Sequence, residues 1–489
     1  MDLNPNPLLK LNHDACYRAI QVRDARYDGR FFTAVKTTRI YCRPVCPART
    51  PLSRNVTFFS TAAAAQEAGY HPCLRCRPET APEVGPGHEL PDNVARALQL
   101  IELGALDDAG VDALARRLGV GERQLRRQFR QHLGASPVTV AQTRRVLLAK
   151  QLIHETQLPM AEIAFAAGFG SIRRFNEIFL DLFGRPPGAL RRSGKPEAPA
   201  GPDGEIKLLL RYRPPYDWDA MLAFLRVRAI PGIETVEDDT YARTLCLDGA
   251  QGTVTVRPGK GHALQATVRF PRLQSLPAII ARLRRVFDLA SDPAAIAAQF
   301  SADPVMTALM QARPGLRVPG AWDGFELAMR AVLGQQITVA AAIRLAGKLV
   351  AAHGVPLARP DGALTHVFPL PETVAAAELA SLGMPRSRAA TLSAVAAAAV
   401  ADPQLFDAGG GLDEAVRRLR MIRGVGEWTA QYIALRQLRE PDAFPHADIG
   451  LIRALERLES RAYTPAQLLA RSEAWRPWRA YAAQHLWTA

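Results

Sequence analysis

The sequence has no long apolar run and little cysteine. No stretch of 18 apolar residues occurs in the chain, so we predict no transmembrane helix. The N-terminal sequence MDLNPNPLLK also lacks the apolar segment of a signal peptide. We therefore expect a cytoplasmic protein with no membrane partner, and six cysteines in such a chain argue against a disulfide framework. With 489 residues, the chain is long enough for about two to four domains.

Acidic residues are outnumbered, and the excess of positive charge is divided among separate segments. The net charge is +14. Lys and Arg outnumber Asp and Glu by 12 to 5 in residues 1–78, by 14 to 6 in 111–192 and by 33 to 27 in 205–489. The two connecting stretches, 79–110 and 193–204, together hold 2 basic and 9 acidic residues. Three basic modules joined by acidic connections suggest one shared polyanionic partner, most simply nucleic acid.

Four of the six cysteines form two close pairs, and they are Cys42, Cys46, Cys73 and Cys76. The pairs are separated by 26 residues, an arrangement typical of a structural tetrahedral zinc site. We predict that these four residues bind one zinc ion. Between the pairs, NVTFFS predicts a strand and AAAAQEAGY a short helix. Cys16 and Cys246 have no such neighbour, and we interpret both as buried or incidental thiols.

Residues 14–78 resemble the zinc-binding, methyl-accepting domain of Ada-type regulators. The resemblance rests on DGRFFTAVKTTRIYCRPVC, NVTFF and AGYHPCLRC. It implies that Cys42 irreversibly accepts a methyl group from a methylated DNA phosphotriester, with zinc holding the sulfur as the nucleophilic thiolate. It also implies contacts to the DNA backbone, for which Thr38, Arg43 and Arg49 are our candidates. The chain departs from the family at two positions that can be arginine, Pro47 and His71.

A second region repeats one plan of helix, glycine turn and basic helix. VDALARRLGVGERQLRRQFRQHLG and MAEIAFAAGFGSIRRFNEIFLDLFGRPP both follow it, with turn glycines Gly119 and Gly168 and a connecting helix near Val138–His154. The two units resemble the tandem helix-turn-helix domain of AraC-type regulators. This resemblance implies that the second helix of each unit enters the DNA major groove. The candidate contacts are Arg123, Arg126, Arg127, Arg130, Ser171, Arg173, Arg174 and Asn176.

The C-terminal half begins with alternating strand-like and helical segments. EIKLLLRY, RTLCLDG, GTVTVRP and ALQATVRF predict strands, whereas Trp218–Arg228 and Leu276–Phe287 predict helices. Together these segments predict an antiparallel sheet within an α+β domain. From residue 293 onward, we expect the chain to be almost entirely helical.

Within this helical part, one stretch predicts two helices joined by a tight glycine turn. Helical spacing extends over Leu412–Met421, stops at Gly424 and Gly426, and resumes over Glu427–Leu438. Glycine leaves the backbone N–H groups of such a turn bare, so that they can bind a phosphate. Asp448 follows in a loop. This order resembles the helix-hairpin-helix signature of base-excision DNA glycosylases, which implies that the hairpin binds the DNA backbone and that Asp448 is catalytic.

A more specific resemblance covers residues 205–489 nearly end to end. PPYDWDAMLAFLRVRAI, ARPGLRVPGAWDGFELAMRAVLGQQITVAAAIRL and AWRPWRAYAAQHLW are among the stretches similar to AlkA-type 3-methyladenine DNA glycosylases. The resemblance implies a base pocket lined by three aromatic residues, Trp428, Tyr432 and Trp478. It also places Gln335 and Gln336 where a residue wedges into the gap left by the extruded nucleotide.

Three further absences narrow the function. Some hairpin-type glycosylases carry a Schiff-base lysine at the position of Trp428, so we expect hydrolysis without strand cleavage. No cysteine follows Cys246, which excludes the four-cysteine iron–sulfur cluster of other relatives. No Pro-Cys-His-Arg motif occurs, so the O6-methylguanine methyltransferase half of typical Ada proteins is missing. The expected reaction is therefore hydrolysis of the N-glycosidic bond of an alkylated purine, assisted by Asp448.

We predict a multidomain α+β protein with four parts. They are a zinc-binding domain at 1–80, a tandem helix-turn-helix domain at 90–192, an α+β domain at 205–290 and a helix-hairpin-helix glycosylase domain at 291–489. This combination predicts a damage-sensing transcriptional activator fused to a repair enzyme. Its expected partners are alkylated DNA, promoter DNA and RNA polymerase, and its expected location is the nucleoid.

Two other functions stay open on the sequence alone. A pure transcription regulator would use its C-terminal half only to bind DNA, and Asp448 at its motif position argues against it. A pure repair glycosylase would use its N-terminal half only for DNA affinity without regulation. Base release from alkylated DNA and footprinting on the protein's own promoter distinguish these alternatives.

Overall fold

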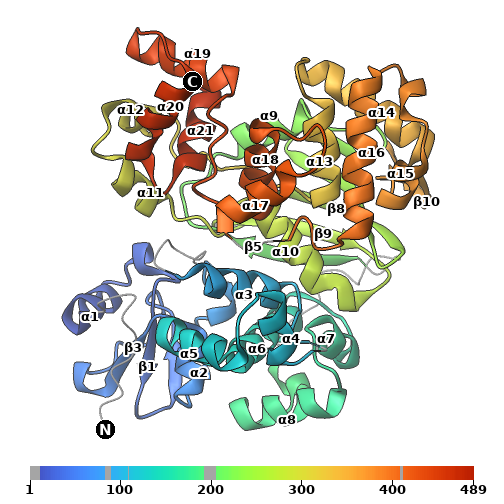
Figure 1. Ribbon diagram of the computed structural model, residues 1–489. Helices are drawn as coiled ribbons and strands as arrows, with labels where there is room; N and C mark the ends of the chain where they lie inside the picture. Colours follow the sequence, from blue (N-terminus) through green and yellow to red (C-terminus); the bar gives the residue numbers. More distant parts are fainter. Residues whose placement is uncertain (1–11, 83–89, 108, 192–204, 408–410) are drawn as a thin grey trace. The chain divides into compact units, whose positions relative to one another are not determined.

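The computed structural model describes residues 12–82, 90–107, 109–191, 205–407 and 411–489. Helices form most of the described chain, and the described strands form three sheets (Figure 1). The chain divides into two compact units, Met1–Arg211 with Arg272–Ala281, and Tyr212–Pro271 with Arg282–Ala489. The predicted multidomain α+β class is confirmed, whereas the finer domain boundaries stay predictions. No described helix is long and apolar enough to cross a membrane.

The N-terminal module is built on a small four-stranded sheet. The strand order is β3-β1-β2-β4, antiparallel except between β2 and β4. Aromatic side chains form much of its core, with Phe31 edge-on to Phe58 and Phe32 edge-on to Tyr41. The strand predicted in NVTFFS and the helix predicted in AAAAQEAGY are both present. The elements are α1 (His13–Gln21), β1 (Phe32–Val35), β2 (Ile40–Cys42), β3 (Val56–Phe59), α2 (Ala62–Glu67), β4 (His71–Pro72) and η3 (Pro78–Thr80).

Two helix-turn-helix motifs follow the N-terminal module and belong to the same compact part of the chain. Gly119 and Gly168, at φ values of +67° and +88°, make the sharp turns between their helices, because glycine adopts this left-handed backbone at no steric cost. Apolar faces then pack inward, with Phe129 buried in the first unit and Phe175 and Phe179 in the second. The helices are α3 (Asp92–Glu102), α4 (Val111–Arg117), α5 (Glu122–Leu133), α6 (Pro137–Glu155), α7 (Met160–Ala166) and α8 (Ile172–Phe183).

The connecting helix α6 packs against the N-terminal module through polar contacts. Lys150 is 0% exposed, and its Nζ donates to the Cys73 carbonyl at 2.8 Å and to Glu79 at 2.6 Å. Thr143 donates to Gln66 at 2.8 Å on the same interface. A buried lysine needs such partners, so the two modules share a specific interface. The second acidic connection, 193–204, lies outside the described residues.

The second unit begins with an antiparallel meander of strands. β6 (Glu234–Glu237), β7 (Thr240–Leu247), β8 (Ala250–Gly259) and β9 (Ala263–Arg269) pair in chain order. β7, β8 and β9 were predicted, whereas β6 was not. The helix α9 (Trp218–Arg226) confirms the one expected there. The predicted strand at the start of this half is β5 (Ile206–Arg211), and the second predicted helix is α10 (Leu276–Val286).

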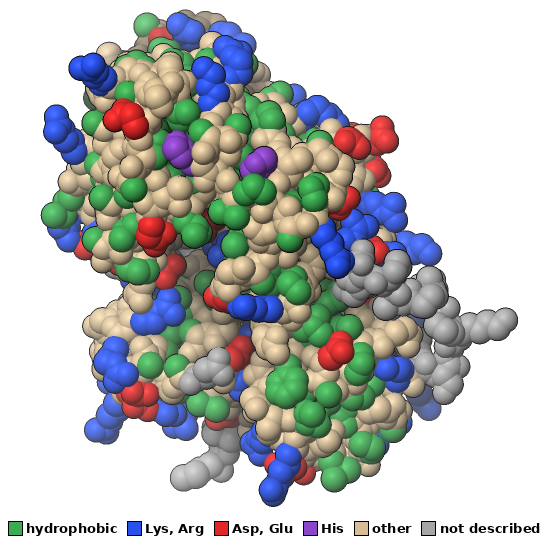
Figure 2. All heavy atoms as spheres, turned by 90° about the vertical axis from the view of Figure 1, so that its right-hand side faces the viewer, with side chains coloured by type: hydrophobic (Ala, Val, Ile, Leu, Met, Phe, Trp, Pro, Cys, Tyr) green, Lys and Arg blue, Asp and Glu red, His purple; other side chains and the backbone are tan. Residues whose placement is uncertain are grey.

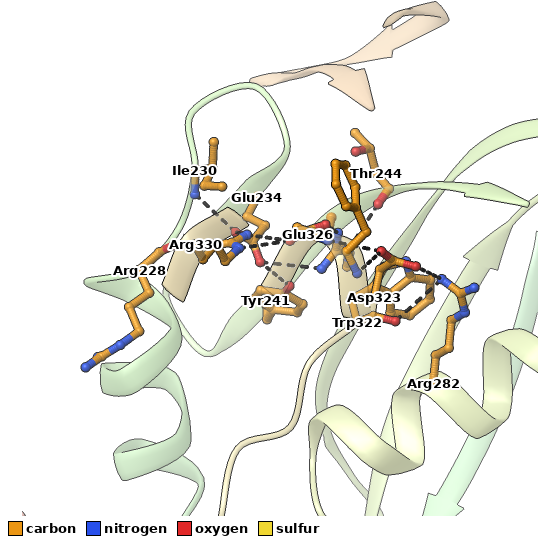
Figure 3. A network of polar contacts seen from close by, with 12 residues as sticks. Arg228, Ile230, Glu234, Tyr241, Thr244, Arg282, Trp322, Asp323, Glu326 and Arg330 are labelled. Carbon is orange, nitrogen blue, oxygen red and sulfur yellow. Dashed lines mark hydrogen bonds and ion pairs between the residues drawn. The ribbon is translucent and has the colours of Figure 1, made fainter. Parts of the chain in front are cut away.

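A buried network of ion pairs fastens this meander to helix α13 (Gly324–Leu333) (Figure 3). Arg243 on β7 donates to Glu326 on α13 at 2.7 Å. Arg330, one turn further along α13, donates to Glu326 at 2.6 Å and also contacts Glu234 on β6. Tyr241 donates to Glu234 at 2.7 Å. Two arginines and two glutamates therefore balance one another in the interior, as buried charges require.

Helices form most of the remaining chain, around one apolar core that includes the fully buried Trp475. One hairpin corrects the expectation of almost uninterrupted helix after residue 293. β10 (Val355–Asp361) pairs with β11 (Leu364–Val367) through a turn with Gly362 at φ +59°, and an Asp-Gly pair is a hairpin signal. The helices are α11 (Pro293–Phe300), α12 (Pro304–Ala312), α13, α14 (Val339–His353), α15 (Pro371–Ala376), α16 (Arg386–Ala401), α17 (Gly411–Arg420), α18 (Glu427–Ile433), the π-helical turn η7 (Ala434–Leu438), α19 (Ile449–Glu459), α20 (Pro465–Ser472) and α21 (Arg479–Trp487).

Candidate functional site

The four paired cysteines meet where two neighbouring strands end. β2 ends at Cys42, and β4, which pairs with it in parallel, ends one residue before Cys73. The four sulfur atoms of Cys42, Cys46, Cys73 and Cys76 lie within 4.8 Å of one another. A tetrahedral zinc ion with Zn–S bonds of about 2.3 Å holds its sulfur ligands about 3.8 Å apart. The cluster therefore has the ligand type, number and size that zinc requires.

Backbone N–H groups point at two of these sulfurs. The N–H of Arg43 donates to Cys76 Sγ and the N–H of Arg75 donates to Cys73 Sγ, both at 3.3 Å. Such bonds favour the thiolate form of a cysteine. Cys73 and Cys76 are buried, whereas Cys42 and Cys46 are partly exposed. Cys42 thus combines a ligand position with access from solvent.

The other two cysteines lie apart from this cluster. Cys16 is buried in a core with Phe31 and Phe58, and burial raises the pKa of its thiol to about 11. Burial also raises the pKa of Cys246. Both thiols are therefore protonated at neutral pH, and a protonated thiol is a poor nucleophile and metal ligand.

The candidate DNA contacts near the cluster have different surroundings. Thr38 and Arg49 are exposed. The Arg43 side chain, 16% exposed, is turned inward, where its Nε donates to Asp28 at 2.8 Å and its Nη1 donates to Thr80 at 2.6 Å. Its guanidinium holds the metal-binding loop in place and is not presented to a ligand. Of the three candidates, Thr38 and Arg49 are accessible to DNA.

The candidate contacts of the helix-turn-helix units lie on the outer faces of α5 and α8. All eight are exposed, and they are Arg123, Arg126, Arg127, Arg130, Ser171, Arg173, Arg174 and Asn176. Arg126 pairs with Glu122 and Arg173 with Glu177, each at 2.8 Å along the same helix. Because the apolar face of each helix is buried, the basic face is left for a polyanion.

The two glycines of the hairpin between α17 and α18 have different surroundings, and each explains differently why glycine occupies the position. Gly424 has a φ of +87°, and an added Cβ would lie 2.0 Å from Thr391 Oγ1 on α16. This glycine is required by packing. An added Cβ on Gly426, by contrast, would meet nothing within 4 Å. Gly426 therefore leaves the start of α18 uncovered, where a DNA phosphate can approach the backbone N–H groups.

Two alanine substitutions are expected to separate these roles. Gly424→Ala should destabilise the fold by roughly 2 kcal/mol or more, because it combines a strained backbone with a steric clash. Gly426→Ala should leave the thermal unfolding temperature unchanged but weaken DNA binding about tenfold, because its methyl group covers the phosphate approach. Calorimetry and fluorescence anisotropy at one fixed salt concentration check both. Wild-type DNA affinity in Gly426→Ala would contradict the hairpin's role in binding.

Asp448 begins α19, and four N–H groups point at its carboxylate. Oδ1 accepts from the N–H groups of Gly450 at 2.8 Å and Leu451 at 3.1 Å, which makes Asp448 the N-cap of the helix. Oδ1 also accepts from the Trp487 indole at 3.0 Å, and Oδ2 accepts from the Trp428 indole at 2.8 Å. The side chain nevertheless stays partly exposed. A negative charge held this firmly can stabilise positive charge that develops on a bound sugar.

Aromatic rings line one side of this carboxylate. Trp428 and Tyr432 stack with centroids 5.2 Å apart, and Trp487 lies edge-on to Tyr432 at 6.3 Å. Trp478, the third ring expected here, packs edge-on against Tyr481 at 5.5 Å. The structure therefore places Trp487 in the cluster, and sequence analysis missed it. No local pattern distinguishes these two tryptophans, because the Trp487 contact with the carboxylate spans 39 residues.

The two glutamines before α14 also differ. The Gln335 side chain donates to the Gly424 carbonyl at 3.2 Å and to Thr429 at 3.0 Å, so it supports the hairpin. Gln336 is exposed and has a φ of +57°. A left-handed backbone is uncommon for residues other than glycine and often marks a functional position. Gln336 is therefore the better placed candidate for a wedge.

Charged side chains of both signs lie on the visible face of the molecule in Figure 2. Figure 2 shows Lys and Arg side chains scattered over the visible face, with acidic side chains between them.

Beside the Asp448 loop, a cavity of about 570 Å³ lies between the start of α19 and the end of α21. Its lining includes Gly450, Arg453, Glu456, Arg457 and Trp487. Two arginines and one glutamate therefore line a cavity at the first turn of the helix that Asp448 caps.

Four protein families match consecutive parts of this chain. Residues 15–79 match the metal binding domain of Ada, and residues 114–193 match a helix-turn-helix domain. Residues 207–323 match the AlkA N-terminal domain, and residues 329–480 match the HhH-GPD superfamily of base excision DNA repair proteins. The cysteine cluster falls within the first match and Asp448 within the last.

Known relatives cover the chain in the same order. A probable bifunctional transcriptional activator/DNA repair enzyme AlkA of Mycobacterium tuberculosis is 42% identical over 477 residues, which are 97% of this chain and 96% of the relative. DNA-3-methyladenine glycosylase 2 of Escherichia coli is 36% identical over 283 residues, 57% of this chain and 95% of the relative. The fold of a 3-methyladenine DNA glycosylase from Archaeoglobus fulgidus matches with a TM-score of 0.51 at 22% identity, over 58% of this chain and 97% of that one.

Proposed function

Because this chain belongs to the family of bifunctional transcriptional activator/DNA repair enzymes, we propose that its C-terminal half hydrolyses the N-glycosidic bond of alkylated purines such as 3-methyladenine in DNA. The observation that carries this proposal is the Asp448 carboxylate, fixed by the indoles of Trp428 and Trp487 beside the Tyr432 ring. The aromatic rings would stack on a base flipped out of the duplex, and the carboxylate would face its sugar.

The chemistry follows from the leaving group. Alkylation at N3 or N7 makes a purine cationic, so the base departs without a general acid. As the C1′–N bond breaks, its electron pair passes to the base, and positive charge develops on the sugar. The Asp448 carboxylate stabilises that charge and can orient the attacking water. Trp428 offers no amine for a Schiff base, so the product is an abasic site in an uncut strand.

A base-release assay tests this activity. DNA treated with a methylating reagent is incubated with the full chain, and the free bases are separated by chromatography. We expect release of 3-methyladenine without strand cleavage. Binding of methylated DNA without base release would favour a pure transcription regulator instead.

We further propose that Cys42 takes the methyl group of a DNA methylphosphotriester. One zinc ion held by the four cysteines maintains the sulfurs as thiolates. The Cys42 sulfur then forms a bond to the methyl carbon, the carbon–oxygen bond of the triester breaks, and its electron pair stays on the phosphate oxygen. The products are a thioether and an ordinary phosphodiester, so the protein is consumed once per methyl group.

This transfer is expected to tighten DNA binding. Four thiolates on Zn²⁺ formally carry two negative charges, and methylation of Cys42 removes one of them. The exposed cations Arg39, Arg49 and Arg75 then face the DNA backbone with less opposing charge, whereas the inward Arg43 contributes little. Because phosphate contacts weaken as salt is added, promoter affinity should rise about tenfold at low salt and less at high salt.

Titration of promoter DNA with methylated and unmethylated protein, at two salt concentrations, measures the change. Equal affinity of the two forms at both salts would leave a repair glycosylase without regulation as the better account. If affinity rises as expected, the helix-turn-helix units would select the promoter, RNA polymerase would be the partner there, and the protein would reside on the nucleoid.

A further inference from the structure

An arginine lies on the interior side of the aromatic cluster beside Asp448. Arg436 sits on the π-helical turn η7, is 3% exposed, and has its guanidinium carbon 5.4 Å from the Tyr432 ring centroid and 5.2 Å from that of Trp487. A third ring, Phe224 of α9, lies 4.5 Å away. Single π-helical turns inside helices are often found at functional sites. This turn directs a buried cation at the rings proposed to hold the flipped base.

No negative charge balances this cation. The Arg436 guanidinium donates to the Pro319 carbonyl at 2.8 Å and to the Gln484 side-chain oxygen at 3.2 Å, both neutral groups. Among the described residues, no carboxylate lies within ion-pair distance of it. Phe224 also contacts a second arginine. The guanidinium carbon of Arg228 lies 4.0 Å from the centroid of the Phe224 ring. Cation–π contacts with the rings stabilise such desolvated charge in place of an ion pair.

The neighbouring charges in Figure 3 do balance. Arg330 and Arg243 are paired with Glu326 and Glu234. The Arg228 carbonyl accepts from Arg330, but the view shows the Arg228 side chain pointing away from this network. These two glutamates are therefore neutralised by their own arginines, and the Asp448 carboxylate, which does contact the rings, accepts from the Trp428 and Trp487 indoles and not from Arg436. The charge that faces Tyr432 and Trp487 from the interior is the positive charge of Arg436, and Arg228 adds a second cation beside the Phe224 ring.

Two titrating groups agree with this geometry. Burial lowers the pKa of Arg436 to about 10, so the side chain stays charged at neutral pH. Burial by itself raises the pKa of Tyr432, but Arg436 and Arg228 outweigh it and lower the pKa overall. The phenol ring therefore experiences a positive field from its interior side.

We propose that Arg436 is a specificity-determining residue of base excision, whose fixed charge acts through Tyr432 and Trp487 to favour release of neutral purines over cationic ones. The proposal rests on the glycosylase activity proposed above. Arg436 does not touch the base, so it is a positioning residue and not a catalytic one. The positive charge of Arg436, and not its shape, is the property that sets the preference between neutral and cationic purines.

The direction of the effect follows from how charge moves during the reaction. When the C1′–N bond breaks, the base gains the bonding electron pair. A cationic alkylated purine leaves as a neutral base, whereas a neutral purine leaves as an anion that then takes a proton from solvent. Water supplies the hydroxyl group to C1′ in both cases and releases a proton. A cation behind the pocket stabilises the anionic leaving group but opposes binding of the cationic base.

Removal of the Arg436 charge is therefore expected to change KM and kcat differently for cationic and for neutral bases. For a cationic base, removing the Arg436 charge should lower both KM and kcat, because the bound substrate loses a repulsion that departure of the base relieves. For a neutral base, the same change should lower kcat and leave KM nearly unchanged. Loss of a merely structural residue would lower kcat for both bases alike.

The experiment compares Arg436→Met, Arg436→Lys and wild type on duplexes carrying one 7-methylguanine, which is cationic, or one hypoxanthine, which is neutral. Arg436→Met should lower the ratio of neutral to cationic kcat/KM about tenfold, as expected for one charge acting across an aromatic ring. Arg436→Lys keeps the charge and should restore the ratio to within about threefold. Gln484→Leu removes a hydrogen bond of Arg436 but not its charge, and should leave the ratio unchanged.

Each result decides between the accounts. An unchanged ratio in folded Arg436→Met, or a ratio that Gln484→Leu lowers equally, would overturn the role of the charge. If Arg436→Met does not fold, Arg228→Met removes the second cation and should lower the ratio about threefold, and no change there would overturn the proposal too. Wild type that releases 7-methylguanine but no hypoxanthine contradicts this proposal alone. Wild type that releases neither base contradicts the glycosylase function itself.

Discussion

Replacing Asp448 with asparagine is expected to lower base excision at least a hundredfold while DNA affinity stays within about threefold of wild type. Asparagine keeps the shape of the side chain and is itself a good N-cap, so the bonds from Gly450 and Leu451 and the start of α19 should persist. The substitution removes only the negative charge and one acceptor for an indole N–H. Loss of one preorganised electrostatic group at the reacting centre costs about 3 kcal/mol or more.

Single-turnover release of 3-methyladenine, measured beside DNA binding and thermal unfolding, checks this expectation. Asp219→Asn, which neutralises an exposed carboxylate on α9, is the matched control and should behave as wild type. Excision by Asp448→Asn within about threefold of wild type would remove Asp448 from the mechanism.

Changing Cys73 to alanine is expected to abolish stoichiometric zinc and to unfold the N-terminal module. Cys73 is buried, its sulfur accepts from the Arg75 N–H, and its carbonyl accepts from buried Lys150. Metal binding in small zinc domains contributes on the order of 10 kcal/mol to folding, more than a small sheet can replace. The loss should also loosen α6, because the Lys150 contact depends on the position of this loop.

Two controls separate metal loss from general destabilisation. Cys16→Ala should lower stability, because it leaves a cavity in the aromatic core, yet retain one zinc ion. Cys246→Ala should retain both zinc and stability in the N-terminal module. Metal analysis of freshly reduced protein gives the readout, and one equivalent of zinc in Cys73→Ala would rule out the four-cysteine site.

The sequence alone predicts those features whose residues lie close together in the chain. The zinc ligands form two short-range pairs, the turn glycines interrupt helical periodicity, and Asp448 follows the hairpin at a fixed spacing. Each of these can be recognised within a short segment of chain, the longest being the 35 residues from Cys42 to Cys76. The same holds for the strands of the second unit, whose alternation is visible in single segments.

The features that it missed depend on distant contacts. Trp487 and Trp478 look equivalent in sequence, and only the fold directs one indole at Asp448. Arg43 reads as a surface cation, but Asp28 and Thr80 draw it inward. Arg436 lies in an ordinary helical pattern, and its charge becomes significant only because Tyr432, Trp487 and Phe224 close around it. The β10–β11 hairpin had a local Asp-Gly signal that the surrounding helical periodicity outweighed.

The most direct test of a combined sensor and repair enzyme is to locate the methyl group after the full chain meets methylated DNA. Protein is incubated with DNA carrying methylphosphotriesters, digested, and examined by peptide mass spectrometry. The account predicts one methyl group on Cys42, at equal yield in wild type and Asp448→Asn, and none in Cys42→Ser. A methyl group on another residue, or no methyl transfer in zinc-loaded wild type, would contradict it.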